Sequence, residues 1–281
     1  MLTVAIIAQG AMGAGIARRL SDNGVTVLTD LEGRSPASAA RAEAAGMRAA
    51  SPKDVARADI ILSVLPPSEA LTLAERYAPL LPATALYADC NAISPEQSLR
   101  VAAALERSGC GFVDAGIIGG PPRADGYTPK LYASGPHAPR LAVLAQHGLK
   151  VPVLEGPLGA ASALKMCYAG ITKGLTALGS ATFLAATRAG AAEALHAELA
   201  ESQPALLPWL GRFIPSMYDK AYRWVGEMEE ISAFLSEDEV RGEAAIYAGM
   251  AALYARLAED QAGEKLEVQA LQRFLALGKK G

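Results

Sequence analysis

One lysine in the middle of the chain combines a residue type and a setting that suit proton transfer. Lys165 follows Gly159-Ala160-Ala161-Ser162-Ala163-Leu164, a run of small residues that would let a ligand or another backbone approach closely. It opens a long alanine-rich segment of helical character, and burial of an ammonium group on an apolar helix lowers the pKa of a lysine. Because a lone helix lysine is usually solvated, the prediction that Lys165 is a general acid and base depends on the motifs upstream.

A glycine-rich turn near the N-terminus has the spacing of a dinucleotide-binding site. Ala8-Gln9-Gly10-Ala11-Met12-Gly13-Ala14-Gly15 follows an apolar segment and precedes a helical pattern over residues 16–23. Gly10 would let a pyrophosphate approach the backbone, and Gly13 would let the helix pack closely on the strand. Alanine stands at position 8, where the usual motif has its first glycine. We predict that the cofactor contacts Gly10, Ala11, Met12 and Gly13.

The segment after the second predicted strand carries two conflicting signals about the cofactor. Asp30 lies 20 residues after Gly10, where a carboxylate binds the ribose hydroxyls of NAD. Arg34 and Ser35 suit the 2′-phosphate of NADP, because a guanidinium forks onto phosphate and a hydroxyl adds a donor. The loop from Asp30 to Arg34 is long enough to move the carboxylate away from the ribose. NADP is therefore the predicted cofactor, and NAD is the alternative.

Three further segments follow predicted strands, at the strand ends where open α/β sheets bind ligands. The dipeptide Leu65-Pro66 is predicted to contact the cofactor. Asn91 is predicted to bind the nicotinamide ribose or the substrate, with a simple Asx turn as the alternative. Residues 114–122 are predicted to form a turn in which Gly119-Gly120 presents backbone N–H groups to a carboxylate.

The elements that would position these residues form an α/β pattern over the first 155 residues. Short apolar segments, typical of strands buried on both faces, alternate with alanine-rich segments of helical length. The predicted strands span 2–8, 25–29, 59–64, 85–89 and 111–114, and helices are predicted to begin at Ser51, Ser68 and Ser94. Right-handed crossovers between such strands give a Rossmann-type doubly wound parallel sheet.

The rest of the chain has the pattern of helices. Beyond residue 190, apolar residues recur at helical spacing in 191–199, 231–236 and 241–257. We predict two domains, a dinucleotide-binding domain over 1–156 and an all-helical domain over 157–281 that begins with a long interdomain helix. Lys165, Tyr168 and Thr172 would share one face of that helix. Tyr168 and Thr172 are therefore predicted to bind substrate, with core packing as the alternative for Tyr168.

Composition excludes several classes of function. The 281 residues are 51% hydrophobic and 20% charged, which is enough apolar material for a large core. The net charge of −3 includes no long run of either sign, so we predict no nucleic-acid or membrane partner. The cysteines form no CxxC pair and the histidines lack metal-ligand spacing, so we predict no disulfide framework and no metal. A cytoplasmic protein that acts on a small molecule is expected.

Three segments together resemble the signature regions of the β-hydroxyacid dehydrogenase family, which includes 3-hydroxyisobutyrate, tartronate semialdehyde and 6-phosphogluconate dehydrogenases. They are residues 8–13, 114–120 and 159–165, in the order and near the spacing of that family. Residues 163–174 and 224–231 resemble the 6-phosphogluconate dehydrogenase-like branch whose C-terminal domain was long described as of unknown function.

The resemblance implies roles for individual residues. Lys165 matches the lysine that takes the proton of a hydroxyl during oxidation and returns it to a carbonyl during reduction. Gly119-Gly120 matches the glycine pair that binds the substrate carboxylate, and Asn91 matches a cofactor-contacting residue. Lys165 and Asn91 are accordingly the predicted catalytic residues. In this family the helical domain commonly forms a homodimer, which we also expect here.

Two positions depart from the family pattern. The serine or threonine that usually precedes the glycine pair is Ile118, and the asparagine usually found three residues after the lysine is Tyr168. Both residues are predicted to contact the substrate. The proton-transfer group is retained while the residues around it differ, so a bulkier or more apolar substrate than a simple hydroxy acid is expected.

The predicted function is that of an NAD(P)-dependent oxidoreductase acting on a small hydroxy-acid-like substrate or a related alcohol or carbonyl compound. Two alternatives remain open. An imine reductase or reductive aminase has a similar architecture, but such proteins usually carry aspartate or tyrosine at the position of Lys165. A non-catalytic NADP-binding sensor would account for the altered substrate positions.

Overall fold

The computed structural model describes residues 2–236 and 242–279. They form two compact units, Met1–Met166 and Cys167–Gly281. The boundary lies inside the long helix α7 (Ala160–Arg188), at residue 166 instead of the predicted 156, because the first turns of this helix pack with the first unit. Residues 237–241 and 280–281 of the predicted helical domain lie outside the described residues, and they include Arg241, the first residue of the predicted segment 241–257.

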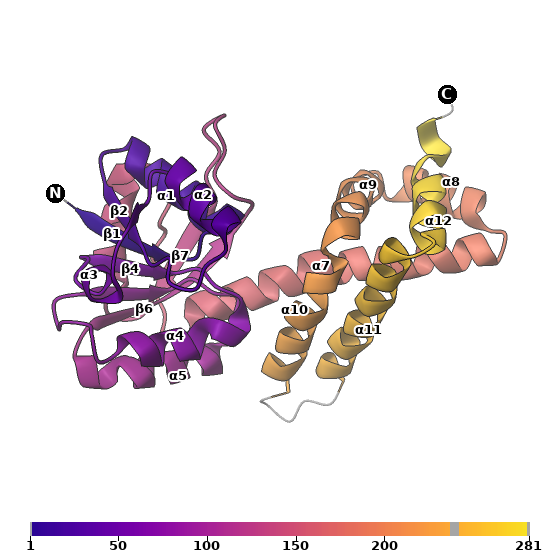
Figure 1. Cartoon of the computed structure of the whole chain (residues 1–281). Helices are drawn as coiled ribbons and strands as arrows, with labels where there is room; N and C mark the ends of the chain where they lie inside the picture. The colour runs from indigo at the N-terminus through magenta and orange to yellow at the C-terminus, as the bar shows by residue number, and fades with distance from the viewer. Residues whose placement is uncertain (1, 237–241, 280–281) are drawn as a thin grey trace. The chain divides into compact units, whose positions relative to one another are not determined.

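The first unit is built on one sheet of seven strands in the order β3-β2-β1-β4-β5-β6-β7 (Figure 1). The first six pair in parallel and β7 runs antiparallel to β6. The strands are β1 (Thr3–Ile7), β2 (Thr26–Thr29), β3 (Arg48–Ala49), β4 (Ile60–Ser63), β5 (Leu86–Asp89), β6 (Gly111–Ile118) and β7 (Lys130–Ser134). The predicted Rossmann-type sheet is confirmed, with its ligand-binding crevice expected at the carboxyl ends of β1 and β4, where the strand order reverses.

Helices cover both faces of this sheet because its strands are apolar on both sides. Along β1, Val4 and Ile6 belong to one buried cluster, while Ala5 and Ile7 belong to another. The first cluster includes residues of α1 and α6, and the second includes residues of α3, α4 and α5. The helices of this unit are α1 (Ala11–Asp22), α2 (Pro36–Ala44), α3 (Pro52–Val55), α4 (Ala70–Tyr77), α5 (Pro95–Leu105) and α6 (Ala138–Leu141).

The predicted helix starts are right at two of three serines. The hydroxyls of Ser51 and Ser94 accept hydrogen bonds from backbone N–H groups at the starts of α3 and α5. The prediction for Ser68 is wrong, since this residue lies inside a 3-10 helix (Pro67–Glu69) and α4 begins after it. Helix α1 also begins at Ala11, five residues before the predicted 16.

The strand pattern was predicted less well toward the far edge of the sheet. The predicted turn 114–122 is wrong over its first half, because β6 continues to Ile118 and pairs with β7 from Asp114↔Ser134 to Ile118↔Lys130. Neither β7 nor the two-residue β3 was predicted. Prolines and glycines border β7 on both sides, so its five residues look like part of a loop when they are read alone.

The second unit is helical throughout its described residues, as predicted. After α7 it contains α8 (Ala192–Ser202), α9 (Leu206–Met217), α10 (Ala221–Phe234), α11 (Glu243–Ala262) and α12 (Leu266–Leu275). Phe183 of α7 stacks on Phe274 of α12 with ring centroids 3.9 Å apart. Lys173 of α7 pairs with Glu227 of α10, and the Tyr254 hydroxyl of α11 donates to the Lys173 carbonyl. These contacts fix α7 as the central helix of the unit.

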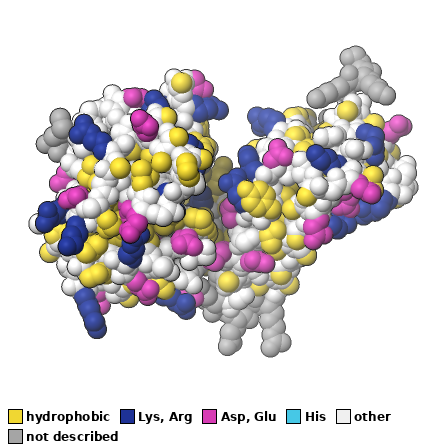
Figure 2. All heavy atoms as spheres, in the orientation of Figure 1, with side chains coloured by type: hydrophobic (Ala, Val, Ile, Leu, Met, Phe, Trp, Pro, Cys, Tyr) yellow, Lys and Arg dark blue, Asp and Glu magenta, His cyan; other side chains and the backbone are white. Residues whose placement is uncertain are grey.

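Surface charge is mixed on both units. On the face shown in Figure 2, basic and acidic side chains alternate with hydrophobic ones, and neither sign gathers into a large patch. Among the described helices, none is both long enough and apolar enough to cross a bilayer. Within residues 2–236 and 242–279 there is also no cluster of three or more His, Cys, Asp or Glu side chains arranged to hold a metal ion.

Candidate active site

The turn after β1 has the local geometry of a phosphate-binding turn. Gly10 is the N-cap of α1 and is exposed, and a Cβ added there would meet no atom within 4 Å. Ala11 and Met12 form the first turn of α1, where N–H groups lack partners within the helix and carry the positive end of its dipole. The residues predicted to contact the cofactor therefore present an open, donor-rich surface.

Close packing behind this turn explains its glycine spacing. A Cβ at Gly13 would overlap the carbonyl oxygen of Ala8, so only glycine lets α1 lie this near β1. Ala8 has a φ of 143°, in the region that favours glycine. The alanine that replaces the usual first glycine has kept the glycine conformation, at some cost in backbone strain.

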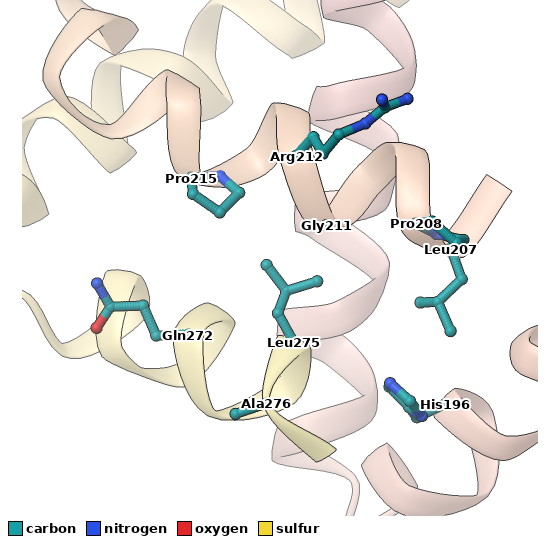
Figure 3. A pocket seen from close by; sticks show the side chains of 9 residues that line it. All are labelled: His196, Leu207, Pro208, Gly211, Arg212, Pro215, Gln272, Leu275 and Ala276. Carbon is teal, nitrogen blue, oxygen red and sulfur yellow. The ribbon is translucent and has the colours of Figure 1, made fainter. Parts of the chain in front are cut away.

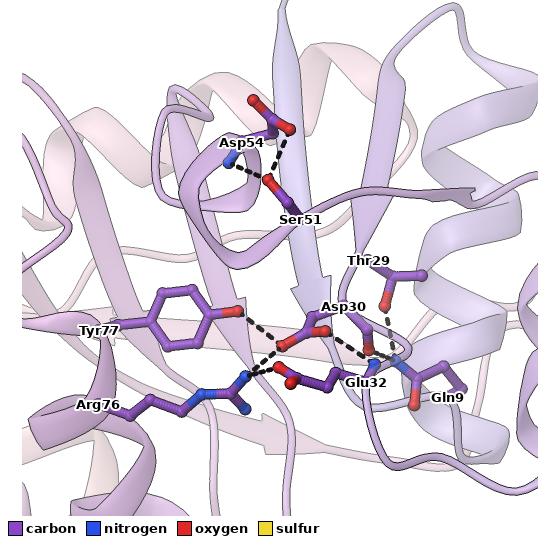
Figure 4. A network of polar contacts seen from close by, with 8 residues as sticks. All are labelled: Gln9, Thr29, Asp30, Glu32, Ser51, Asp54, Arg76 and Tyr77. Carbon is purple, nitrogen blue, oxygen red and sulfur yellow. Dashed lines mark hydrogen bonds and ion pairs between the residues drawn. The ribbon is translucent and has the colours of Figure 1, made fainter.

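Beside this turn, Asp30 after β2 is held by protein groups (Figure 4). Its carboxylate accepts hydrogen bonds from the Glu32 N–H at 2.9 Å and the Tyr77 hydroxyl at 3.2 Å, and it pairs with Arg76 at 3.1 Å. Asp30 is only 5% exposed. Burial and the neighbouring Asp30 carboxylate raise the pKa of Tyr77 above its usual range. The carboxylate that would bind the ribose of NAD is thus engaged by Arg76 and Tyr77.

The residues predicted to bind a 2′-phosphate lie at the start of α2. Arg34 is exposed, and the Ser35 hydroxyl caps the helix by accepting from the Ser38 N–H at 3.3 Å. The structure adds Arg41, which the sequence analysis missed. Its Nε donates to the carbonyl of Gln9 at 2.8 Å and its terminal nitrogen donates to the Ser38 hydroxyl at 3.0 Å. Arg41 lies well beyond Arg34 in the chain, so no short sequence motif indicates that it contacts Gln9 and Ser38.

At the next strand ends, Asn91 ties the exit of β5 to the exit of β4. Its Oδ1 accepts from the Leu65 N–H, and its Nδ2 donates to Ser63 and Asp89 at 2.9 Å each. Its backbone N–H also donates to Asp89, which forms an Asx turn. Both amide hydrogens are thus used inside the protein, and one lone pair of Oδ1 remains. The side chain positions the predicted cofactor segment that begins at Leu65, and the predicted substrate contact would have to use that lone pair.

Asp114, which the sequence analysis placed only in a signature stretch, fixes the start of α7. It is 1% exposed and accepts from the N–H groups of Ala161 and Ser162 at 3.0 Å each. Three serine hydroxyls complete its shell, from Ser98 of α5, Ser134 of β7 and Ser162 of α7. A carboxylate at a helix N-terminus also interacts favourably with the helix dipole. This shell joins β6, β7, α5 and α7 immediately before Lys165.

Lys165 reaches back to the sheet from the second turn of α7. Its Nζ donates to the carbonyl of Ile117, next to the predicted substrate turn. Gly116 makes this approach possible, because a Cβ there would come within 2.7 Å of the Ala161 carbonyl oxygen and 3.2 Å of the Lys165 Cβ. The structure therefore brings Lys165 to the segment that contains Ile118 and Gly119-Gly120.

The predicted substrate turn begins at Gly119, whose φ of 125° requires glycine. Ile118 is the last residue of β6 and is partly buried. The Gly120 N–H, predicted to bind a carboxylate, donates to the hydroxyl of Tyr127 at 3.2 Å. Tyr127 was not identified from the sequence, because it lies seven residues further along a loop whose path no short pattern predicts.

Tyr168 and Thr172 belong to the second unit and are less suited to their predicted role. Tyr168 is 48% exposed, but the Thr172 hydroxyl donates to the Tyr168 carbonyl at 2.9 Å, back along the helix. Thr176, one turn beyond Thr172 on α7, is fully buried. A cavity of about 460 Å³ lies elsewhere in this unit, lined by residues of α8, α9 and α12 (Figure 3), and it includes none of the predicted site residues.

Two family models match the chain. The model described as the NAD binding domain of 6-phosphogluconate dehydrogenase matches residues 3–142. The model described as a domain of unknown function (DUF1932) matches residues 186–257, within the helical unit. The first match contains the turn after β1 and the strand ends described above, up to and including the Gly119-Gly120 turn.

Similar proteins extend the match over most of the chain. An uncharacterised 28.5 kDa protein of Methanothermus fervidus is 28% identical over 204 residues, which are 72% of this chain and 78% of that protein. The Mycobacterium tuberculosis 3-hydroxyisobutyrate dehydrogenase, solved with L-serine, has the same fold, with a TM-score of 0.72 and 21% identity over 93% of this chain and 95% of that one.

The conserved protein MTH1747, of unknown function and structurally similar to 3-hydroxyacid dehydrogenases, is 31% identical with a TM-score of 0.75, over 92% of this chain and 99% of its own. The identity, the coverage and the two family models agree with the dinucleotide turn and with the helical second unit. This chain therefore belongs to the β-hydroxyacid dehydrogenase and 6-phosphogluconate dehydrogenase-like family of NAD(P)-binding proteins, in the branch with the C-terminal helical domain of formerly unknown function.

Proposed function

We propose that this protein is an NADP-dependent oxidoreductase that interconverts an alcohol and a carbonyl group on a small hydroxy-acid-like substrate, with Lys165 as the general acid and base. The observation that carries the proposal is the contact of the Lys165 ammonium with the Ile117 carbonyl. This contact brings the Lys165 side chain close to Gly119-Gly120, at the edge of the sheet where the turn after β1 also lies, which supports a role in proton transfer. Proton donor, anion-binding turn and cofactor turn thus belong to one compact unit.

The residues after β1 fit a bound dinucleotide. The open space at Gly10 and the first N–H groups of α1 would hold its pyrophosphate, and Leu65, fixed by Asn91, would lie beside its nicotinamide half. When bound, the nicotinamide accepts or supplies the hydride. Asn91 acts in this proposal by positioning the loop at Leu65, with its remaining Oδ1 lone pair as the only part of its amide available to a ligand.

Lys165 moves the proton that accompanies hydride transfer. In the oxidation direction its amine takes the proton of the substrate hydroxyl, and in the reduction direction its ammonium returns a proton to the carbonyl oxygen. The Ile117 carbonyl holds Nζ at the substrate turn, and Asp114 fixes the helix from which the side chain extends. Two observations support a small acid as substrate: the Gly119-Gly120 turn, and the L-serine with which the similar M. tuberculosis 3-hydroxyisobutyrate dehydrogenase was solved.

The preference for NADP rests on the surroundings of Asp30. Arg76 and Tyr77 already occupy its carboxylate, which weakens its use as a ribose acceptor. Arg34 precedes Ser35, and Arg41 extends from the last turn of α2 to the Ser38 hydroxyl, which lies 3.1 Å from the Ser35 hydroxyl. In this proposal the two guanidinium groups and the Ser35 hydroxyl bind the additional phosphate.

We also propose a homodimer formed through the helical unit. Tyr168, Ile171, Leu175 and Leu178 are 38% to 62% exposed along α7. Their alternating spacing of three and four residues is that of a helix-packing seam, and apolar stripes of this kind usually mark an interface. Sedimentation analysis of the purified protein tests this, and a strictly monomeric protein would contradict it.

Replacement of Lys165 tests the central role. Lys165→Ala should lower turnover by a factor on the order of 100 or more, because proton transfer by a positioned side chain contributes that much, while NADPH affinity stays nearly unchanged. Lys165→Arg should be similarly impaired, since a guanidinium keeps its proton. Lys53→Ala removes an exposed ammonium group on α3 and serves as the control. Turnover is measured with small hydroxy acids, semialdehydes, diols and cyclic imines, with NADPH and NADH in parallel.

The same screen separates the alternatives. Full turnover by Lys165→Ala would exclude the lysine as the acid and base. Turnover of cyclic imines alone would favour an imine reductase, and tight NADPH binding without turnover of any compound would favour a sensor. A steep preference for NADH would contradict the assignment of Arg34 and Ser35.

A further inference from the structure

A tyrosine supplies a hydroxyl at the substrate turn, where the family's serine or threonine is missing. Ile118 stands just before the glycine pair, so this chain has no hydroxyl there. In the structure, the hydroxyl of Tyr127 lies against the pair from the other side of the loop. It accepts the Gly120 N–H at 3.2 Å, and a Cβ at Gly119 would overlap it.

The loop that carries Tyr127 is built to hold it in place. The Tyr127 N–H donates to the Asp125 carboxylate at 2.9 Å, and the Tyr127 carbonyl accepts the Arg123 N–H at 3.0 Å. Arg19 of α1 donates to the Arg123 carbonyl at 2.9 Å. The Arg123 guanidinium lies over the Tyr127 ring, 4.6 Å from its centroid. The loop is thus tied to the dinucleotide helix, and its tyrosine carries a cation on one face.

The direction of the hydrogen bond leaves the tyrosine proton available. Because the oxygen of Tyr127 accepts from Gly120, its own O–H must point elsewhere, and within residues 2–236 and 242–279 it meets no acceptor. Accepting an N–H bond strengthens a hydroxyl as a donor. The side chain is 36% exposed, so a ligand oxygen can reach it.

The side chains of Tyr127 and Lys165 contact the same short stretch of backbone, from Ile117 to Gly120. Lys165 contacts the carbonyl of Ile117, and Tyr127 contacts the N–H of Gly120. Three residues of extended chain span at most about 10 Å. A small acid can therefore place its hydroxyl or carbonyl oxygen at Lys165 and its carboxylate at the glycine pair.

We propose that Tyr127 is a substrate-specificity residue whose hydroxyl donates a hydrogen bond to the carboxylate of a small hydroxy or oxo acid bound at Gly119-Gly120. It takes over, from the far side of the loop, the function of the hydroxyl that Ile118 lacks. This inference rests on the proposed function, because it uses the same turn and the same substrate class. The Arg123 guanidinium over the ring is paired with Asp125 at 3.2 Å, so the group that binds the carboxylate in this proposal is the Tyr127 hydroxyl itself.

The test uses two ligands of the same carbon-chain length, one of which ends in a carboxylate where the other ends in a hydroxymethyl group. 3-Hydroxypropionate and 1,3-propanediol are titrated into the full-length protein saturated with NADPH, a complex in which an alcohol cannot react. Tyr127→Phe should weaken binding of the acid about tenfold, the usual effect of losing one hydrogen bond to a charged group, and leave the diol unaffected. Ile118→Ser in the Tyr127→Phe background should recover part of the loss. Tyr222→Phe, at a 67% exposed tyrosine of α10, is the matched control.

Each other outcome has a defined meaning. Equal acid binding by Tyr127→Phe and the unmodified protein, or no preference for acid over diol in the unmodified protein, overturns the assignment. The assignment is also overturned if Tyr127→Phe lowers the Tm and Ile118→Ser does not recover acid binding, because Tyr127 would then be purely structural. Acid binding that depends on Tyr127 without turnover of any compound supports the inference and contradicts the proposed oxidoreductase. Turnover of alcohols or imines without a preference for acids supports the proposed oxidoreductase and contradicts the inference about Tyr127.

Discussion

The two ends of the ligand-binding edge hold their buried carboxylates in different ways. After β2, Asp30 is paired with Arg76, a cation whose side chain is 44% exposed. In β6, the Asp114 carboxylate accepts from two backbone N–H groups and three serine hydroxyls, all of them neutral donors. Between them, the Asp89 carboxylate accepts hydrogen bonds from the backbone N–H and the side-chain amide of Asn91.

This difference distinguishes a region that would recognise the cofactor from carboxylates that hold the structure together. Asp30 stays engaged by Arg76 and Tyr77, so in the proposed function the other residues of the loop after β2 set the cofactor preference. A carboxylate enclosed by five neutral donors cannot leave them without a large cost. We infer that Asp114 and Asp89 hold the elements that carry Lys165 and Leu65, whereas the region around Asp30 selects the nucleotide. Three predictions test this contrast.

The largest effect is expected at Asp114. Asp114→Asn replaces one acceptor oxygen by an amide that faces donors, so it should lower the free energy of unfolding by about 3 kcal/mol. Turnover should fall with it, because α7 carries Lys165. Urea unfolding measures the first effect. Ser98→Ala removes a single donor and should cost about 1 kcal/mol. An Asn variant as stable as the unmodified protein would refute the supporting role.

A pH-dependent effect of intermediate size is expected at Asp89. Burial, with a smaller contribution from nearby Asp114, raises its pKa from 3.8 to about 7, against the opposing hydrogen bonds from Asn91. The folded state thus keeps the proton that the unfolded state releases. Stability from this group is complete below about pH 4 and decreases as the pH rises to about 7.

Asp89→Asn should remove that slope. Relative to the variant, the unmodified protein should lose on the order of 1 to 3 kcal/mol between pH 4 and pH 7. Urea unfolding at several pH values measures the difference. Glu43→Gln, at an exposed carboxylate of α2, should leave the slope unchanged. Parallel pH profiles of Asp89→Asn and the unmodified protein would show that Asp89 is ionised in both states.

The smallest effect is expected at the nucleotide end. Arg34→Ala removes an exposed guanidinium and should raise the Kd for NADPH about tenfold without changing the Kd for NADH or the Tm. Arg41→Ala should weaken NADPH binding similarly but also lower the Tm slightly, because it loses the bond to the Gln9 carbonyl. Fluorescence titration measures both affinities. If both cofactors weaken equally, these arginines do not read the 2′-phosphate.

Features coded by adjacent residues were predictable. Gly10 and Gly13 were identified because the start of α1 and its close contact with the end of β1 depend on residues within four positions of each other. The doubly wound sheet followed from short apolar segments that alternate with helical ones. The loop after β6 was predicted poorly, because the extension of β6 exists only through pairing with β7.

By itself, the sequence determined the fold class and the dinucleotide turn, because burial periodicity and glycine spacing are local properties of the chain. The role of Lys165 was inferred from the motifs upstream and from the family resemblance, and it stays a prediction. Only the tertiary structure decided which groups surround these residues. Arg41 meets Gln9 across 32 positions, and Asp114 meets Ser162 across 48. Tyr127 reaches Gly120 only because its loop folds back onto α1. A hydrogen bond depends on the distance between two groups in space, and the separation of two residues along the chain does not predict that distance.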